Sequence, residues 1–442
     1  MKKFFSLMMA LMLLFPLFAS AEKLNKIPAH FTVTYKVNER TERNNKTFIS
    51  KDQIKTVHAS IDQEINGLVD AFDEKYAPEL KPLDSPRRNS RLDIHVVHSF
   101  SGKSAMSFLV LARQSYRRNQ VKSPFETRSY DMETGKQIFL TDLFLEDGEA
   151  WDILADAVKT RLNEYFPKKA ADEQTLASLI TKEALQNTPF MLGPVTLSLH
   201  YEASVLYPDQ PTLMRVNIPY ASLRHAMTEY GKEQTDNSMY KMVALTFDDG
   251  PTYTTTASLL NQLRYAGVPA TFFLVGDRID EYKDIVMRQN DENHSLQSHH
   301  FKHTDSTKST VGRIQSYAKQ FDETLSSLVG TLPIMMRAPY GNYENYMKAG
   351  LEFPQILWDV DTKDWTGKSS NGVLSVVKKE TKDGSIILMH DIEEKTPEST
   401  KLVVNWLREQ GYVCVTVEDL LLHNGHDPKE KKVYYSVSPS SK

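Results

Sequence analysis

Residues 241–251 read KMVALTFDDGP, and the fold of the second half of the chain is best approached from this stretch. The apolar run 241–247 has the composition of a buried strand, and it ends at two adjacent carboxylates, Asp248 and Asp249. Buried carboxylates need a partner or a cation, whereas Asp beside Gly is also a common turn sequence. Taken alone, the stretch fits a functional strand end and a solvated turn about equally well.

The sequence that follows alternates between strand and helix patterns. The expected elements are a helix at 255–266 and strands at 270–275, 334–336, 355–359 and 385–390, with helical patterns between the strands. Strands that alternate with helices indicate a parallel sheet or a barrel. In such folds the functional side chains follow the C-terminal ends of the strands. Polar residues at those positions are therefore the first candidates for a site.

Four histidines lie within ten residues after the second of these strands. His299 and His303 are four residues apart, so on a helical turn both imidazoles point the same way and can share an ion. With one carboxylate of the aspartate pair they form a two-histidine, one-carboxylate set, which leaves metal positions open for water and substrate. The other two histidines are interpreted as bystanders: His294 and His300.

Three more strand ends carry reactive side chains. Arg337 follows the strand at 334–336, and a guanidinium there can hold a carboxylate in a fixed orientation through its fork of donors. The strand at 355–359 leads to Asp364 and Trp365, and the strand at 385–390 ends in a histidine followed by an aspartate.

In this order, these groups resemble the five motifs of the NodB-type polysaccharide deacetylases, carbohydrate esterase family 4. The matching segments read TFDDGP at 246–251, HxxxH at 299–303, RAPYG at 337–341, DxxDW at 361–365 and LMHD at 388–391. Ala338 departs from the family pattern, where proline is frequent, and the segment before His299 has fewer glycines than usual. The resemblance covers residues 241–422 and implies an α/β fold, a distorted (β/α)7-type barrel.

The resemblance also implies a role for each residue and a divalent metal, zinc by its ligand set, with cobalt, nickel or manganese as alternatives. The implied roles are metal ligands (Asp249, His299 and His303), a general base (Asp248) oriented by Arg337, a general acid (His390) supported by Asp364, a backbone N–H donor to the oxyanion (Tyr340) and an acetyl pocket (Trp365 and Leu388). Separate acid and base groups predict a bell-shaped dependence of activity on pH.

Residues 22–230 mix helices and hairpins without regular alternation, which favours a smaller α+β domain. The expected elements are strands at 31–37, 92–100, 105–116, 195–199 and 213–218, helices at 51–76, 150–165 and 173–186, and a hairpin around 133–136. Segments 130–144 and 216–220 resemble the extracytoplasmic DUF4163 and DUF3298 domains, which precede the catalytic domain in some peptidoglycan deacetylases. They also resemble the outer part of a lysozyme-binding anti-sigma factor.

This second resemblance suggests contact of the N-terminal region with wall polymers or lysozyme. For five basic residues of this region a solvated charged face is the preferred interpretation, and contact with acidic wall polymers is the alternative. They are Arg87, Arg88, Arg113, Arg117 and Arg118.

The first 21 residues have the pattern of a secretory signal peptide, with basic Lys2 and Lys3, an apolar run at 4–18 and small residues at 19–21. We therefore expect an exported protein, in the cell wall, the extracellular space or the periplasm, with no stable membrane span after cleavage; an uncleaved anchor is the alternative. The expected organisation is a signal peptide (1–21), the α+β region (22–230), a polar linker (231–240), the catalytic domain (241–425) and a polar tail (426–442).

The composition limits the function further. A formal net charge of −4 argues against a nucleic-acid binder, which normally has a basic excess. The only cysteine, Cys414, lies in a strand-like run and is expected to be a buried apolar residue. The expected function is removal of N-acetyl groups from the peptidoglycan sugars N-acetylglucosamine or N-acetylmuramic acid. The alternatives are a chitin-oligosaccharide deacetylase, an acetylxylan esterase, or a non-catalytic wall- or lysozyme-binding protein.

Overall fold

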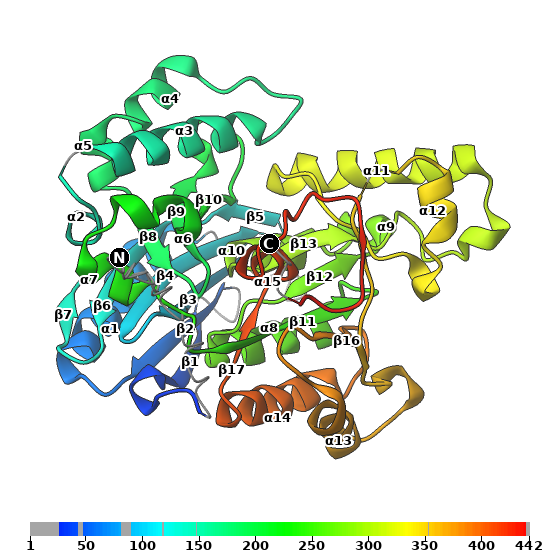
Figure 1. Ribbon diagram of the computed structural model, residues 1–442. Helices are drawn as coiled ribbons and strands as arrows, with labels where there is room; N and C mark the ends of the chain where they lie inside the picture. The colour runs from blue at the N-terminus through cyan, green and yellow to red at the C-terminus, as the bar shows by residue number, and fades with distance from the viewer. Residues whose placement is uncertain are drawn as a thin grey trace, which may run out of the picture.

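The structure, a computed structural model, describes residues 26–42, 47–80, 90–116, 119–146, 148–351 and 353–438 (Figure 1). The predicted signal peptide at 1–21 lies outside these ranges, as do four of the five basic residues named above: Arg87, Arg88, Arg117 and Arg118. Among the described helices, none combines the length and the apolar character that crossing a membrane requires.

A seven-stranded sheet forms the base of the N-terminal region, and α1 (Ala59–Tyr76) packs on it. Its strand order is β1-β2-β3-β4-β6-β7, with β5 paired to β4. All pairs are antiparallel except β2 with β3. The bounds are β1 (Thr34–Glu42), β2 (Thr47–Lys55), β3 (Ser90–Ser101), β4 (Ala105–Tyr116), β5 (Asn119–Lys122), β6 (Phe125–Asp131) and β7 (Lys136–Gln137). The predicted strands at 92–100 and 105–116 and the hairpin around 133–136 are confirmed.

The helix predicted over 51–76 is wrong in its first residues, because 51–55 belong to β2. Ser50, Asp52 and Ile54 are buried in alternation, which is the period of a strand. Asp52 is a buried carboxylate at a position that reads as the polar face of a helix. Its Oδ2 accepts hydrogen bonds from the Val96 N–H at 2.8 Å and from the Arg264 guanidinium.

Helices and a second, three-stranded sheet complete this region. The sheet order is β10-β9-β8. The bounds are α2 (Leu140–Leu143), α3 (Glu149–Glu164), α4 (Glu173–Leu179), α5 (Lys182–Gln186), β8 (Phe190–Leu192), β9 (Thr196–Glu202), β10 (Leu213–Pro219), α6 (Tyr220–Leu223), α7 (Glu229–Gln234) and the short 3-10 turns η1 (Ala29–Phe31), η2 (Ala77–Glu79), η3 (Ala203–Val205) and η4 (Arg224–Ala226). The helix predicted at 173–186 is interrupted, because Thr181 caps α5 by accepting a hydrogen bond from the Ala184 N–H at 3.2 Å.

The C-terminal half alternates strands and helices as predicted. Its elements are β11 (Lys241–Asp248), α8 (Thr255–Ala266), β12 (Thr271–Leu274), α9 (Gly276–Ile279), α10 (Lys283–Asp291), β13 (Ser295–Ser298), η5 (Ser306–Lys308), α11 (Val311–Val329), η6 (Pro339–Gly341), α12 (Glu344–Lys348), β14 (Gln355–Ile356), β15 (Val360–Asp361), η7 (Asp364–Thr366), α13 (Ser370–Glu380), β16 (Ile386–His390), α14 (Thr396–Glu409), β17 (Tyr412–Val415), α15 (Val417–His423) and β18 (Val433–Tyr434).

These strands close into a distorted barrel. Parallel pairings join β16, β11, β12 and β13. Single bridges then lead from Ser298 to Met336 and from Met336 to Gln355 in β14. The same chain segment continues into β15, which pairs back with β16 and closes the ring. The predicted barrel is therefore confirmed. Of the strand predicted at 334–336, only Met336 forms bridges to its neighbours.

The predicted linker at 231–240 is not a free connection. α7 occupies its first residues, and Asn237 Oδ1 accepts a hydrogen bond from the Gly102 N–H at 2.9 Å. The Tyr240 hydroxyl donates to the Gly102 carbonyl at 3.0 Å. The polar residues of this segment thus bind the turn between β3 and β4. Where one domain ends and the next begins stays a prediction.

The predicted polar tail at 426–442 is also packed, as far as the structure describes it. Figure 1 draws this segment in red as it returns across the barrel. β18 pairs in parallel with β14, and Val437 is buried, with its N–H donating to the Gly384 carbonyl at 2.8 Å. Backbone pairing with the barrel therefore fixes a segment whose composition reads as solvent-exposed.

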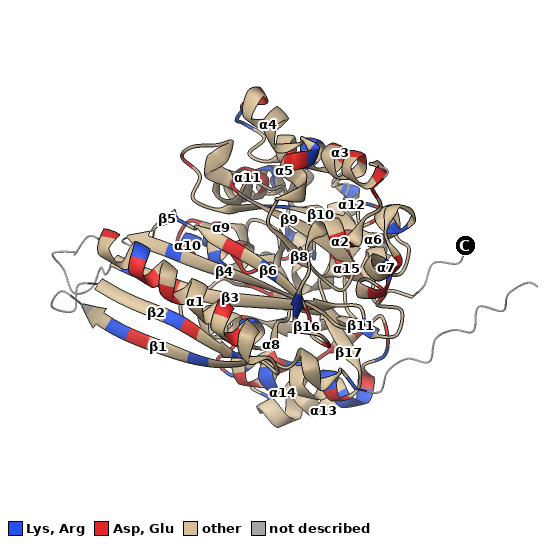
Figure 2. Cartoon of the chain, turned by 90° about the vertical axis from the view of Figure 1, so that its left-hand side faces the viewer, with Lys and Arg blue, Asp and Glu red and all other residues tan. Residues whose placement is uncertain are grey.

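The two halves of the chain share a core. One hydrophobic cluster includes Phe100 and Phe108 of the N-terminal sheet together with Met242 and Ala244 of β11. In Figure 2 acidic and basic residues are interspersed along β1, β2 and α1. Other charged residues of this region are buried, among them Asp52, Asp93 and Arg113. Arg113, interpreted from the sequence as part of a solvated face or, alternatively, of a wall-contacting one, is 6% exposed and donates to Gln120 Oε1 at 2.6 Å. Both interpretations are therefore wrong for Arg113, which stabilises the interior.

Candidate active site

The C-terminal ends of neighbouring barrel strands bring the predicted residues together. In the parallel register of β11 and β16, Asp248 lies directly beside His390. Met242 and Ala244 belong to the barrel interior, and Val243, Leu245 and Phe247 pack against the outer helices. Alternation along the strand therefore turns Asp248 inward.

Asp249, His299 and His303 form a cluster suited to a metal. Asp249 Oδ1 lies 3.3 Å from the Nε2 atoms of both histidines, and one ligand atom from each residue lies within 4.8 Å of the others. The two histidines lie on an irregular loop after β13. The predicted helical turn is therefore wrong. His300, between them, has φ +68°, which bends the loop so that both imidazoles reach Asp249.

Two features of this cluster fit a divalent ion. His299 Nδ1 donates to the Arg337 carbonyl at 2.8 Å, so its Nε2 presents a lone pair to Asp249, as in metal-binding histidines whose second nitrogen is held by a carbonyl. Asp249 Oδ1 is buried without a hydrogen-bond partner among the described residues. Burial opposes ionisation of Asp249, but the protonated forms of His299, His303 and His390 outweigh it and lower its pKa to about 2. An ionised carboxylate and two imidazoles match the donors that zinc prefers.

The two bystander histidines have partners elsewhere. His294 Nδ1 accepts a hydrogen bond from the Ala270 N–H at 3.1 Å, at the opposite end of β12 from the cluster. His300 Nε2 donates to the Ile314 carbonyl at 3.3 Å and packs edge-on against Tyr346.

Replacing His299 with alanine should lower zinc affinity by at least about 100-fold, since loss of even an outer-shell partner costs about 10–100-fold. Competition with a chromophoric chelator measures the affinity directly. The exposed His225, on the N-terminal region, provides the control: His225→Ala should keep the wild-type affinity. Equal zinc affinity in both variants would contradict the assignment of this cluster as the metal site.

Arg337 holds Asp248 from inside the barrel. Its guanidinium is fully buried, and Nη1 donates to Asp248 Oδ1 and to Thr246 Oγ1, both at 2.8 Å. The remaining donors bind the carbonyls of Ile356 at 2.9 Å and Leu357 at 3.0 Å. The arginine therefore does not bind the carboxylate in a bidentate manner. It fixes one oxygen, and its other donors anchor it to the backbone.

His390 and Asp364 form a charge-balanced pair. His390 Nδ1 donates to Asp364 Oδ1 at 2.9 Å, and the His390 N–H donates to Oδ2 at 2.7 Å. Burial alone would lower the pKa of His390, but the hydrogen bond to Asp364 and the charges of Asp248, Asp364 and Asp249 raise it to about 9. At neutral pH the imidazole is therefore protonated, with Nε2 as its second donor.

The predicted substrate contacts lie around this centre. Tyr340 has φ +62° and its side chain packs edge-on against His303, with ring centroids 4.7 Å apart. Trp365, in η7, is 57% exposed, and Leu388 is buried in β16 beside Asp361. Exposed aromatic rings beside a polar centre suit an extended ligand better than a small enclosed one.

Asp391 is a residue to which the sequence assigned no role. It is 1% exposed, its N–H donates to the Asp248 carbonyl at 3.3 Å, and its Oδ2 accepts from Thr256 Oγ1 at 2.7 Å. A Cβ on Gly250 would lie 2.0 Å from Asp391 Oδ2, so only glycine fits there. Asp391 thus supports the loop that carries Asp248 and Asp249. The sequence signal that could have identified it is an acidic residue directly after an apolar strand.

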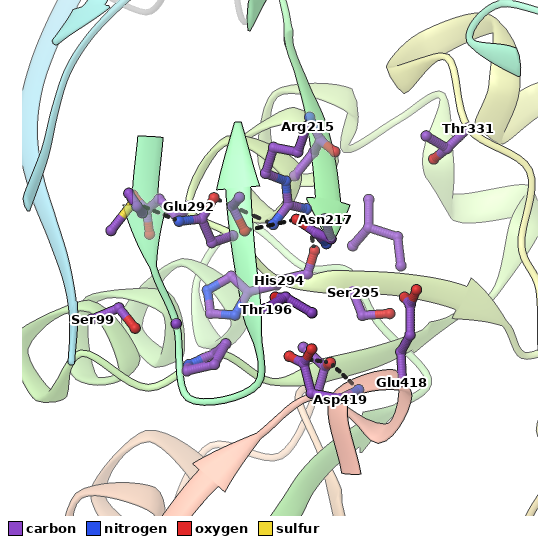
Figure 3. Close-up of a pocket in the computed structure, with 18 of the residues that line it drawn as sticks. Ser99, Thr196, Arg215, Asn217, Glu292, His294, Ser295, Thr331, Glu418 and Asp419 are labelled. Atoms are coloured by element: carbon purple, nitrogen blue, oxygen red, sulfur yellow. Dashed lines mark hydrogen bonds between the residues drawn. The ribbon is translucent and has the colours of Figure 1, made fainter. Parts of the chain in front are cut away.

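A cavity of about 290 Å³ lies away from these residues, between the three-stranded sheet and the floor of the barrel (Figure 3). Figure 3 shows Arg215, His294, Glu418 and Asp419 around it. Pro269 precedes β12 and Ser295 begins β13, so the cavity lies at the N-terminal end of strands whose C-terminal ends carry the reactive groups. It is therefore separate from the candidate active site.

Comparison with known proteins gives consistent matches. The sequence model of the family described as polysaccharide deacetylase matches residues 235–353. The peptidoglycan-N-acetylglucosamine deacetylase PgdA of Listeria monocytogenes is 28% identical over 301 residues, which cover 66% of this chain and 63% of the relative. The peptidoglycan-N-acetylmuramic acid deacetylase PdaC of Bacillus subtilis is 30% identical over 197 residues, 45% of this chain and 42% of the relative.

This chain thus spans less than two thirds of the length of either relative. Among solved structures, a T48 deacetylase with substrate is 38% identical; the match covers 45% of this chain and 99% of that one, with a TM-score of 0.43.

Proposed function

The chain belongs to the polysaccharide deacetylase family, and from this membership we propose that it hydrolyses the N-acetyl groups of peptidoglycan sugars with a divalent metal. One arrangement carries the proposal: at the end of β11 a metal-type cluster adjoins a carboxylate held by arginine, and a protonated histidine lies beside them on β16. N-acetylglucosamine and N-acetylmuramic acid, named for the two relatives, are both candidate sugars.

Amide hydrolysis requires an activated water and a protonated leaving group. A divalent ion held by Asp249, His299 and His303 would supply a Lewis acid for the acetyl carbonyl. Asp248 accepts the proton of the attacking water; Arg337 binds its Oδ1 and leaves Oδ2 for this task.

The second half of the reaction uses residues of the neighbouring strand β16 and of η7. As the C–N bond breaks, the His390 Nε2–H donates its proton to the amine, and acetate and the free amino sugar result. Asp364 keeps the imidazole oriented through Nδ1. The Tyr340 N–H stabilises the oxyanion, an effect of about 3–4 kcal/mol in comparable sites, and Trp365 and Leu388 enclose the acetyl methyl group.

We propose zinc as the metal, since a carboxylate and two imidazoles suit it, with cobalt, nickel and manganese as competitors for the same donors. We place the reaction outside the cytoplasm, where peptidoglycan lies, in agreement with the signal-peptide pattern at 1–21.

Replacing Asp364 with asparagine should shift the alkaline limb of the pH profile. The active form carries a protonated His390, so activity is lost as pH rises through its pKa of about 9. Without the Asp364 charge, that midpoint should fall toward the usual value of 6.5. A bound cation opposes the other two carboxylates, so the midpoint in the loaded enzyme lies lower in both proteins.

The pH dependence of kcat measures this shift. Thr396 Oγ1 also donates to Asp364, at 3.1 Å, and Thr396→Ser, which keeps the hydroxyl, should retain the wild-type midpoint. An unchanged midpoint in Asp364→Asn would remove His390 from the role of general acid.

The decisive test of the function is acetate release from purified peptidoglycan and from chitin oligomers, with added zinc and after chelation. Metal-dependent release from peptidoglycan establishes the reaction, and mass spectrometry of the muropeptides identifies the sugar. Release from chitin oligomers alone would replace the substrate. Absence of release from both, with zinc bound, would contradict an amide hydrolase.

A further inference from the structure

An apolar shelf lies beside the candidate active site, and part of it comes from the C-terminal segment. We define the shelf as Tyr340, Tyr343, Met347 and Tyr435. Tyr340, Met347 and Tyr435 are 64%, 47% and 52% exposed. Large exposed apolar side chains that gather next to a reactive centre mark a binding surface.

The contacts connect this shelf to the metal cluster. Tyr340 packs against the ring of His303, and Tyr343 follows three residues later, at the start of α12. Met347 lies one helical turn on, with its N–H donating to the Tyr343 carbonyl at 3.1 Å. Tyr435 lies close enough to Tyr343 to raise the pKa of its hydroxyl. A continuous path of residues therefore leads from His303 to Tyr435.

Backbone pairing places Tyr435 at the rim of the barrel. β18 runs parallel to β14, and the Leu357 N–H donates to the Tyr434 carbonyl at 2.7 Å. Parallel strands end at the same edge, so Tyr435, directly after β18, lies at the edge where Asp248 and His390 end their strands. The pairing uses backbone groups alone, so the Tyr435 side chain is not needed to hold the segment.

Two other aromatic residues of this region are held by the interior. Tyr346 is fully buried against His300. Trp358 is partly buried, and its ring centroid lies 5.5 Å from the Arg337 guanidinium. The more exposed ring on this side of the site beyond Tyr340 is Tyr435, with the partly exposed Tyr343 beside it.

We infer that Tyr435, with Tyr343, forms a subsite that stacks on a pyranose ring of the glycan, next to the sugar that loses its acetyl group. The inference rests on the proposed function and extends it to chain length: the site holds a polymer across several sugars. A pyranose has an apolar face of C–H groups and hydroxyls at its edge. A tyrosine offers a matching flat apolar ring with a polar tip.

The test compares a hexamer and a dimer of N-acetylglucosamine as substrates, since only the longer one reaches past the reacting sugar. Replacing Tyr435 with alanine should lower the hexamer-to-dimer ratio of kcat/KM by about five- to tenfold, the effect of losing one aromatic contact. The change should come from KM for the hexamer. Tyr435→Phe, which keeps the ring, should retain the wild-type ratio. Phe139, also 52% exposed but outside the barrel, provides the control, Phe139→Ala. A wild-type ratio in a folded Tyr435→Ala variant would overturn the inference.

A binding measurement separates this result from the proposed function. Titration of the hexamer into Asp248→Asn, with and without Tyr435→Ala, reports affinity without turnover. If the wild type hydrolyses no glycan but Tyr435→Ala weakens hexamer binding five- to tenfold, the subsite stands and the deacetylase function fails. Equal affinity of the two proteins, or absence of binding to both, would overturn the subsite.

Discussion

Asp248→Asn should lower kcat by about 10³-fold, within the range of a lost general base, and leave zinc affinity unchanged. The amide is nearly isosteric and still accepts the hydrogen bond from Arg337, but it cannot take a proton from water. Asp248 is not one of the proposed metal ligands, which are Asp249, His299 and His303, so the metal stays bound. Acetate release and zinc content, measured on the same protein, check both parts.

The matched control is Asp277→Asn, the same chemical change on an exposed carboxylate in α9, which should keep wild-type activity. Thermal unfolding shows whether the buried guanidinium of Arg337 destabilises the fold of Asp248→Asn. Activity within tenfold of wild type would assign the base to another group. This variant also separates an enzyme from a wall-binding protein, because a binder should retain its function without Asp248.

Local sequence was sufficient for the parts of the site that follow from strand ends. Asp248 and His390 each complete an apolar strand, and parallel pairing brings them side by side. Their catalytic roles, implied by resemblance, stay predictions until the variants are measured.

The backbone conformation of the site residues could not be predicted from the local sequence. Four of the six described non-glycine residues with positive φ surround the candidate active site: Asp249, His300, Tyr340 and Lys363. This conformation costs about 1–3 kcal/mol per residue and persists only where surrounding contacts impose it. The periodicity of the sequence does not reveal those contacts. The loop that brings His299 and His303 together was for that reason mistaken for a helical turn.

Polar composition was the other source of error. Residues 231–240 and the C-terminal segment read as solvent-exposed, yet Asn237 and Tyr240 bind the β3–β4 turn and β18 extends the barrel. A polar residue signals exposure only when its partner is water. Here the partners lie 135 and 138 residues away for Asn237 and Tyr240, and β18 pairs with a strand far back in the sequence, so only the folded structure identifies them.

Glu292→Gln should destabilise the fold by about 3–5 kcal/mol, because removal of one member of a buried ion group leaves the others unpaired. Glu292, at the end of α10, is 3% exposed. It accepts from Arg288 Nε at 2.8 Å and from His95 Nδ1, on β3, at 2.6 Å, and Arg264 Nε lies 3.9 Å away. The carboxylate thus joins two barrel helices to the N-terminal sheet, and we expect both halves of the chain to unfold in one transition.

Denaturant unfolding followed over pH tests this role of Glu292. Burial alone would raise the pKa of Glu292, but Arg288, His95 and Arg264 lower it well below 4.5. A depressed pKa stabilises the folded state above the unfolded value, and this stabilisation is lost as pH falls through the folded one. The difference between wild type and Glu292→Gln should therefore be complete at pH values above about 4.5 and shrink below. Glu281→Gln, on the exposed surface before α10, should stay within about 0.5 kcal/mol of wild type. Two separate transitions in the wild type, or a Glu292→Gln variant as stable as Glu281→Gln, would show that the halves fold independently of this contact.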